Sequence, residues 1–437
     1  PLRLSYFDEE GNAWMYNKST DSYYLHYFSR KQPDLNWENP EVRQEIFDMM
    51  RFWFDKGIDG FRMDSISLIA KDPSFPLIDS KKYPDIFSFY AKEPRLHLYL
   101  HEMNRQVLSK YDCMSVGEGS AVMVDDVAKF VDPAREELNM LYHFDAARIR
   151  NTTLPDNPES GIDYSLIALK KMFTEWDKAV DKGWPSIYLG NHDQPRMVSR
   201  FGSDKDEFRA LSAKMLITFL LTMRGTPYWF AGDEIGMRNI RFDRIEDYND
   251  IDTINRYKKA KAEGKDPQAV LDEQKETGRD NARTPFQWDR SPEAGFTAGT
   301  PWLKVNPDYT WINVADEEKD PTSILNYFKK VVSFRKENPS LIYGSYHLLD
   351  AENPQCYIFL RKTGADTYLI MLNFSPKAAI STPGIDMSNA HVLLDNYGDR
   401  SHMAPQKDIT LRPFEAIVFQ LNHPVYESFI DSLDLLE

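Results

Sequence analysis

The first clear pattern along the chain is a run of apolar residues at helical spacing, which includes Ile46 and Met50. Asn39, which a proline follows, is typical of a helix N-cap, and Gly57 is typical of a helix end. Residues 58–63 come directly after this glycine and have the apolar character of a short β-strand. The stretch therefore predicts a helix that is followed by a strand.

The same order of helix and strand recurs along most of the chain. Helices are expected near 93–110, 163–182, 206–223 and 322–338, and strands near 113–117, 138–144, 186–190 and 226–230. Strands that alternate with helices indicate an α/β fold with a parallel sheet covered by helices. The spacing is compatible with a doubly wound sheet or with part of a (β/α)8 TIM barrel.

Polar and potentially reactive side chains follow the predicted strands, at the point where each strand ends: Asp64, Glu118, His192 with Asp193, and Asp233 with Glu234. Catalytic groups from the carboxyl ends of several strands are typical of the (β/α)8 barrel. Such a barrel needs eight strands, and the chain supplies five. At roughly 30 residues per βα unit, the other three need on the order of 100 residues. We therefore expect the N-terminal strands of the barrel to be missing from this chain.

These patterns divide the chain into three expected regions. Residues 1–36 are polar and aromatic without a clear period, and we expect a loop-rich remnant there. Residues 37–340 are expected to form the catalytic barrel, with an ordered loop over 231–321 that lacks obvious regular structure. Residues 341–437 are expected to form a C-terminal antiparallel β-sandwich domain. Strand-like segments there lie at 355–361, 367–374 and 416–421.

The charge of the chain narrows its expected partners. Its 53 basic and 68 acidic residues give a net charge of −15, which repels phosphate backbones and anionic lipid. Nucleic acid and membrane surfaces are therefore not expected, whereas a neutral sugar is compatible with this charge. No apolar run of about 18 residues occurs, so no membrane span is expected. Two cysteines, Cys113 and Cys356, exclude a disulfide scaffold and fit a reducing, cytoplasmic compartment.

Asp64 and Glu118 are the residue types that cleavage of a glycosidic bond requires. One carboxyl group protonates the leaving oxygen, and in a retaining enzyme the other attacks from about 5–5.5 Å away. Arg62 lies two residues before Asp64, so both face the same side of a strand, and a guanidinium favours the ionised carboxylate that a nucleophile needs. Partial burial beside other acids would raise the pKa of Glu118 and suit it to acid catalysis.

The tripeptide Asn191-His192-Asp193 adds polar groups that are expected at the same rim of the barrel. Asp193 is suited to accept hydrogen bonds from sugar hydroxyls, and His192 to donate one. Each of these residues alone is more typical of a turn, a solvated surface or a structural ion pair. Their occurrence together at matching strand ends favours a glycosidase site.

Three of these segments resemble characteristic regions of the α-amylase family of glycoside hydrolases: Gly60-Phe61-Arg62-Met63-Asp64, Val116-Gly117-Glu118 and Asn191-His192-Asp193. Their order and spacing agree with that family as well. Gln32-Pro33-Asp34-Leu35-Asn36-Trp37 and residues 279–288 are similar to the oligo-1,6-glucosidase branch. The resemblance covers essentially the whole chain. It implies that the five strands are barrel strands 4–8 and that residues 1–36 belong to a domain inserted after the third strand.

The resemblance also implies roles for single residues. Asp64 would be the nucleophile, Glu118 the general acid/base and Asp193 a third acid that holds the sugar, with Arg62 and His192 as supporting contacts. Arg279 would grip the non-reducing end of the substrate, with Arg283 as a neighbour, which gives an exo-acting glucosidase of the pocket type. No cofactor and no metal is implied at these residues. The first barrel loop, which holds a calcium ion in some members, is expected in the missing N-terminal part.

Several alternatives stay open on the sequence alone. Ser65 matches neither the Val usual in enzymes that prefer α-1,6 bonds nor the residue usual in α-1,4 enzymes. Sucrose isomerases and transglucosylases share such a site, but the isomerases carry an Arg-x-Asp-Arg motif where this chain has Arg148-Ile149-Arg150-Asn151. A non-catalytic, glucosidase-like partner subunit is a third hypothesis, which the retained acids disfavour. The expected partner is an oligosaccharide or disaccharide substrate, and the missing N-terminal segment as a separate chain is a further candidate.

Overall fold

The computed structural model describes Tyr6 and residues 12–79, 81–82, 86–364, 366–388, 390–400 and 407–421. The chain forms two units. The first unit consists of Pro1–Phe144, Lys178–Ser186 and Ile251–Pro267, and the second of Asp145–Asp177, Ile187–Asp250 and Gln268–Glu437. Among the described residues, no helix combines the length and the apolar character that crossing a bilayer requires.

Helix α1 (Pro40–Asp55) of the first unit begins and ends as the sequence predicts. The Asn39 side chain accepts a hydrogen bond from the N–H of Glu41, and Pro40 occupies the first helical position. Gly57 follows the helix with a φ of +94°, a conformation that glycine adopts without strain. The first unit continues with α2 (Ile86–Tyr90), α3 (Arg95–Gln106), α4 (Val127–Val131) and α9 (Ile251–Ala262).

Three parallel strands form the sheet of the first unit, in the order β3 (Gly60–Met63), β4 (Met114–Glu118) and β5 (Met140–Tyr142). A side chain at Gly60 would place its Cβ 1.9 Å from the carbonyl oxygen of Met114, so the close approach of β3 to β4 requires glycine there. The predicted strands 58–63, 113–117 and 138–144 are confirmed with slightly shifted bounds. Their carboxyl ends lie at one edge of the sheet, where Asp64 and Glu118 are found.

A β-hairpin lies within residues 1–36, which were expected to be loop-rich. Strands β1 (Trp14–Asn17) and β2 (Ser22–Leu25) pair antiparallel, and the rings of Tyr16 and Tyr23 face each other across the pair with centroids 5.3 Å apart. The hairpin was not predicted because each strand has only four residues, too few for a visible alternation.

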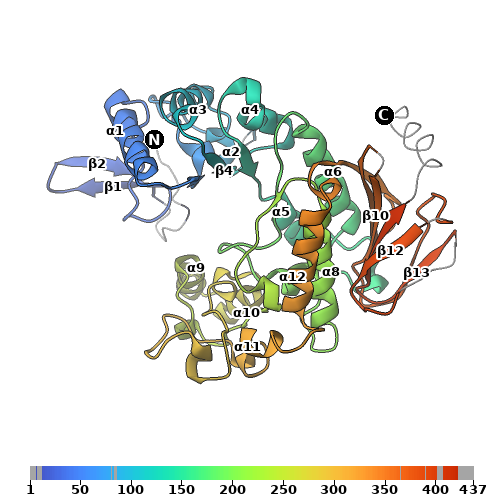
Figure 1. Ribbon diagram of the computed structural model, residues 1–437. Helices are drawn as coiled ribbons and strands as arrows, with labels where there is room; N and C mark the ends of the chain where they lie inside the picture. Colours follow the sequence, from blue (N-terminus) through green and yellow to red (C-terminus); the bar gives the residue numbers. More distant parts are fainter. Residues whose placement is uncertain are drawn as a thin grey trace. The chain divides into compact units, whose positions relative to one another are not determined.

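Most residues of the remaining predicted helices and strands lie in the second unit. Helices α8 (Arg209–Thr222) and α12 (Ile324–Glu337) pack side by side (Figure 1). Strand β7 (Thr226–Pro227) pairs with β6 (Ser186–Ile187), and the Tyr228 N–H donates to the Ile187 carbonyl at 2.7 Å. The other helices are α5 (Asp145–Thr152), α6 (Leu166–Ala179), α7 (Met197–Phe201), α10 (Pro267–Thr277), α11 (Val314–Glu317) and α13 (Ser340–Tyr343).

The segment 231–321 contains more regular structure than the sequence predicts. Helices α9 and α10 lie in it, together with the short α11 and several 3-10 turns. The expectation of a loop without regular structure was wrong, because these helices are short and highly charged and so show little apolar periodicity. The expectation of order is confirmed.

The C-terminal part of the second unit is antiparallel, as predicted. Its five-stranded sheet has the order β12 (Ala390–Asp395), β14 (Ala416–Leu421), β10 (Asp366–Asn373), β9 (Cys356–Thr363) and β8 (Ser345–Leu349). A second sheet pairs β11 (Ala379–Ser381) with β13 (Ile409–Leu411). Buried residues of both sheets, such as Ile358, Met371 and Leu411, share one apolar core. The division of the chain at residues 36 and 340 stays a prediction.

Candidate active site

One guanidinium joins the two predicted catalytic carboxylates in the first unit. Arg62 lies on β3, and its Nη1 donates to Oδ1 of Asp64 just beyond the strand end. Its Nη2 donates to Oε2 of Glu118, the last residue of β4, at 3.1 Å. The structure therefore brings Arg62, Asp64 and Glu118 together, as the strand-end pattern predicts.

The two carboxylates lie in different surroundings. The side chain of Asp64 is 72% exposed, whereas Glu118 is 6% exposed. Burial raises the pKa of Glu118 to about 7; the Ser65 N–H and the charge of Arg62 oppose this rise, and Asp64 adds to it. An accessible carboxylate beside a buried, proton-holding one is the arrangement that a nucleophile and an acid catalyst need.

Two groups near Glu118 were missed by the sequence analysis. Ser65 has a φ of +42°, in the left-handed region, and its backbone N–H points at Glu118 Oε2 from 2.8 Å. Tyr142, the last residue of β5, accepts a hydrogen bond from Arg62 Nη2 through its hydroxyl oxygen. The rule that selected Asp64 and Glu118 also applies to Tyr142, since it too ends a parallel strand. It was overlooked because the strand was expected to run to residue 144, which placed Tyr142 inside the strand and not at its end.

A second cluster lies within the second unit and contains the other four predicted residues. Asp193 Oδ1 accepts hydrogen bonds from Arg283 Nη2 at 2.7 Å and from Arg279 Nη1 at 3.2 Å. His192 Nε2 lies 3.2 Å from Asp193 Oδ2, and the His192 carbonyl accepts from Arg283 Nε at 2.7 Å. Asn191 caps the turn by accepting the N–H of Asp193. The cluster presents fixed donors and acceptors, which suits recognition of hydroxyl groups.

A buried aspartate that the sequence analysis missed holds the arginines of this cluster. Asp250 is 3% exposed; its Oδ1 accepts from Arg279 Nη2, and Arg283 Nη1 lies 3.7 Å away. Asp280 Oδ2 in turn accepts the backbone N–H groups of Asn249 and Asp250 at 2.7 and 2.8 Å. Asp250 belongs to the long segment after the last predicted strand, where no spacing rule singles it out.

Asp233 and Glu234, which follow β7, have structural surroundings. Asp233 is 4% exposed and lies 3.7 Å from the equally buried Arg196. Burial raises the pKa of Asp233 to about 7, and Arg196 opposes that rise. A side chain at Gly190 would bring its Cβ 2.8 Å from Asp233 Oδ2, so this close approach requires glycine just before the Asn191–Asp193 turn. Glu234 accepts from the Gly232 N–H at 2.7 Å.

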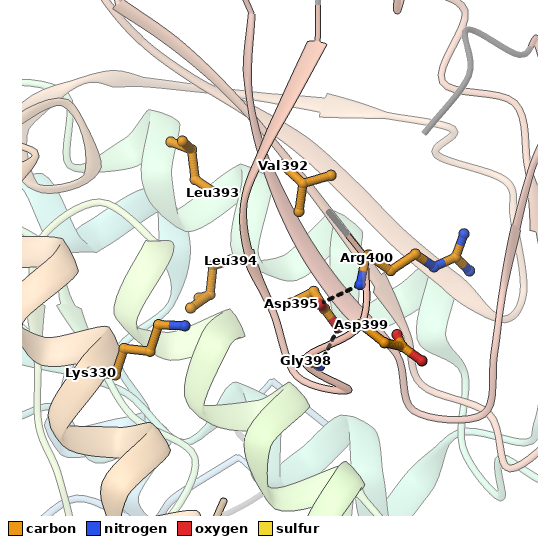
Figure 2. Close-up of a pocket in the computed structure, with 8 residues that line it drawn as sticks. All are labelled: Lys330, Val392, Leu393, Leu394, Asp395, Gly398, Asp399 and Arg400. Atoms are coloured by element: carbon orange, nitrogen blue, oxygen red, sulfur yellow. Dashed lines mark hydrogen bonds between the residues drawn. The ribbon is translucent and has the colours of Figure 1, made fainter. Parts of the chain in front are cut away.

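A pocket of about 300 Å³ in the C-terminal sheet region contains none of the predicted residues. Lys330 of α12 and residues of β12 and the following turn line it (Figure 2). The Asp395 carboxylate there accepts backbone N–H groups of Gly398 and Arg400, so it closes the turn. In the described part of the chain, no cluster of His, Cys, Asp or Glu side chains is placed to hold a metal ion.

Comparison with known proteins yields one family. Residues 4–344 match the model of the alpha amylase catalytic domain. The oligo-1,6-glucosidase of Parageobacillus thermoglucosidasius is 48% identical over 95% of this chain and 74% of its own length, and that of Bacillus cereus is 44% identical over 94% and 74%. Among solved structures, the isomaltulose synthase SmuA from Protaminobacter rubrum is 38% identical, with a TM-score of 0.89 over 96% of this chain and 75% of that protein.

Proposed function

Because this chain belongs to the α-amylase family and is a glycoside hydrolase, we propose that it is a retaining, exo-acting α-glucosidase for short α-glucosides such as isomalto-oligosaccharides. One observation carries the proposal: Asp64 and Glu118 share the Arg62 guanidinium, and only Glu118 is buried. The names of the relatives from Parageobacillus and Bacillus support the choice of substrate.

In the proposed reaction Asp64 attacks the anomeric carbon while Glu118 gives its proton to the departing oxygen. The bond from the sugar to the leaving group breaks as the bond to Asp64 forms, so a covalent glycosyl-enzyme results. Glu118, now ionised, takes a proton from water, whose oxygen displaces Asp64 and regenerates the starting configuration. The hydrogen bond from Arg62 orients the Asp64 carboxylate in the first step and stabilises it as the leaving group in the second.

Binding of the sugar is assigned to the second cluster in the same proposal. Asp193 would accept hydrogen bonds from sugar hydroxyls, and His192 would donate one. Arg279, with Arg283 beside it, would hold the non-reducing end and so restrict the enzyme to exo action. The support is the pair of arginine hydrogen bonds that fix Asp193, together with the resemblance of residues 279–288 to the oligo-1,6-glucosidase branch.

The test is turnover of isomaltose and of an aryl α-glucoside by Asp64→Asn and Glu118→Gln variants. We expect kcat to fall by on the order of 10⁴-fold or more in both, because each residue forms or breaks a bond in the reaction. The anomeric configuration of the first-formed glucose, followed by NMR, should be α. Undiminished glucose release by Asp64→Asn, or an initial β product, would contradict the proposal.

Sucrose isomerisation is the second candidate, because a solved isomaltulose synthase has the same fold at 38% identity. An observation against isomerisation is that Arg150 already has partners within the protein: its Nη2 donates to Asp163 Oδ2 at 2.7 Å, and its Nε donates to the Arg200 carbonyl oxygen at 2.6 Å. Arg148 lies 3.7 Å from Asp145 on the same helix. Chromatography of the products from sucrose decides: glucose and fructose support hydrolysis, and isomaltulose or trehalulose as the main product supports isomerisation.

Location and partners complete the proposal. A cytoplasmic location is supported by Cys113 and Cys356, which are both free thiols. An oligosaccharide or disaccharide is the proposed small-molecule partner, and neither nucleic acid nor membrane is included, given the net charge of −15. Completion of an eight-stranded barrel by N-terminal strands, on this or a separate chain, also stays a proposal.

A further inference from the structure

Tyr142 contacts the same guanidinium as the two carboxylates. Glu118 and Tyr142 are register partners on the parallel strands β4 and β5, so their side chains leave the same face of the sheet. The Gly119 N–H donates to the Tyr142 carbonyl at 2.9 Å, which fixes this register one residue beyond Glu118. The tyrosine hydroxyl therefore reaches the Arg62 group from the side of β5.

The N–H groups of both Arg62 Nη atoms are engaged by three acceptors. Nη1 serves Asp64, and Nη2 divides its two N–H groups between Glu118 Oε2 and the Tyr142 hydroxyl oxygen. The phenol stays neutral, because burial and the nearby Glu118 raise the pKa of Tyr142. The Arg62 guanidinium carbon also lies 5.5 Å from the centre of the tyrosine ring, a favourable position for a cation.

We propose that Tyr142 is a positioning residue whose neutral hydroxyl occupies one N–H of Arg62 and so keeps that N–H away from Glu118. The inference rests on the proposed function, because it assigns Tyr142 a part in keeping the acid catalyst protonated. Arg62 can then hold Asp64 as an anion and still give Glu118 only a single hydrogen bond of 3.1 Å. The uncharged hydroxyl of Tyr142 thus allows Arg62 to contact an ionised Asp64 and a protonated Glu118 at the same time.

The proton of Glu118 depends on this balance. The groups that face its carboxyl are the Ser65 N–H and Arg62, which favour ionisation, and Asp64, which opposes it, while Tyr142 lies on the neighbouring strand. If the hydroxyl is removed, the planar guanidinium of Arg62 is free to tilt as a unit, which brings the freed N–H of Nη2 toward the Glu118 carboxyl, to which Nη2 already donates. A second charge-assisted hydrogen bond stabilises the carboxylate, so Glu118 should lose its proton at lower pH.

The test compares Tyr142→Phe with the unaltered protein by NMR of ¹³C-carboxyl-labelled glutamate, in which Glu118→Gln identifies the resonance. The midpoint of the Glu118 titration should fall by about one pH unit in Y142F. The alkaline limb of the kcat/KM profile should move down by the same amount, and the acid limb should stay. Tyr111→Phe is the matched control: its hydroxyl donates to Asp55 at 2.9 Å, at the other end of β4, and its loss should shift neither.

A second variant separates the hydroxyl from the ring. Tyr142→Gln retains a neutral oxygen acceptor for Arg62, so the Glu118 midpoint should return toward that of the unaltered protein. An unchanged midpoint in Y142F, or the same fall in Y142F and Y142Q, would overturn the inference while leaving the proposed function intact. Full activity of Asp64→Asn would instead remove the proposed function, and the NMR titration would still report on Tyr142.

Discussion

The two polar clusters differ in the ratio of cations to carboxylates. In the first unit Arg62 alone serves Asp64 and Glu118. In the second unit Arg279 and Arg283 together serve Asp193 and Asp250. A single cation between two acids leaves one acid to hold a proton, whereas two cations between two acids leave a set of paired, fixed charges. The first arrangement is suited to proton transfer and the second to holding a ligand.

Burial acts in opposite ways in the two clusters. Glu118 is buried with only a share of one guanidinium, and its pKa rises to about 7. Asp250 is buried even more completely, but its Oδ1 accepts from Arg279 and its backbone N–H is fixed by Asp280. Burial therefore favours the protonated form of Glu118, which has only a share of one guanidinium, whereas buried Asp250 accepts from Arg279 and fixes its orientation.

Among changes that leave both acids of the first cluster in place, the largest expected effect comes from removing the cation that they share. Arg62→Met leaves Asp64 and Glu118 without a guanidinium, so the pKa of Glu118 should rise further above its usual range and Asp64 should lose the hydrogen bond that orients it. We expect kcat/KM to fall by about 10³-fold, and the alkaline limb of the pH profile to move to higher pH. Steady-state kinetics with an aryl α-glucoside between pH 5 and 9 measure both.

Arg51→Met is the control for this change. Arg51 pairs with Asp48 on the surface of α1, also in the first unit, and an exposed pair of this kind contributes little. A pH profile that keeps its limbs in Arg62→Met would contradict the view that one cation sets the protonation of both acids.

The two clusters also differ in how many of their residues could be predicted from the sequence. The proximity of Arg62, Asp64 and Glu118 could be predicted because strand position is a local pattern, and parallel strands bring their ends to one edge. Asp193 and its partners were found through the same rule and through a resemblance. Neither the strand-end rule nor the resemblance predicted Asp250, because it contacts Arg279, which lies 29 residues further along the chain.

The fold shows the same division between local and distant information. Helix α1 and strands β3 to β5 were predicted because their caps and apolar residues lie within the segment itself. The hairpin β1–β2 was missed, since its four-residue strands gain stability from a cluster that includes Leu68 and Ala121, far away in sequence. Contacts between residues that are far apart in sequence produce no apolar periodicity within the segment itself.

The second cluster is weakened most sharply through Asp250. Asp250→Asn removes the charge of the buried one of the two carboxylates that hold the arginines, so Arg279 and Arg283 lose their orientation. We expect KM for isomaltose to rise by about 10- to 100-fold with a smaller change in kcat, because the cluster is proposed to bind and not to transfer protons. Initial-rate kinetics over a wide range of isomaltose concentrations separate the two constants.

Asp243→Asn is the matched control, because Asp243 is 84% exposed and pairs with Lys275 at the surface of the same unit. Its kinetic constants should stay within about twofold of the unaltered protein. A fall of kcat in Asp250→Asn at constant KM would mean that the second cluster takes part in the chemical step, and the distinction drawn between the clusters would fail.

The smallest effect tests the proton of Glu118 without any substrate. The pKa of Glu118 is about 7 in the folded protein and has an ordinary value of 4.5 in an unfolded chain. Between these pH values the folded state binds the proton and the unfolded state has released it, so this group makes stability fall as pH rises from about 4.5 through 7. The loss in the free energy of unfolding is at most about 3 kcal/mol, and Glu118→Gln, which is neutral at every pH, avoids it.

Thermal unfolding measures this difference. Between pH 5 and 8 the Tm of Glu118→Gln should gain a few degrees relative to the Tm of the unaltered protein. The control is Glu45→Gln, an exposed change on α1, whose Tm should follow that of the unaltered protein. Parallel Tm curves for Glu118→Gln and the unaltered protein would mean that Glu118 is already ionised near pH 5, and the first cluster would then lack its proton donor.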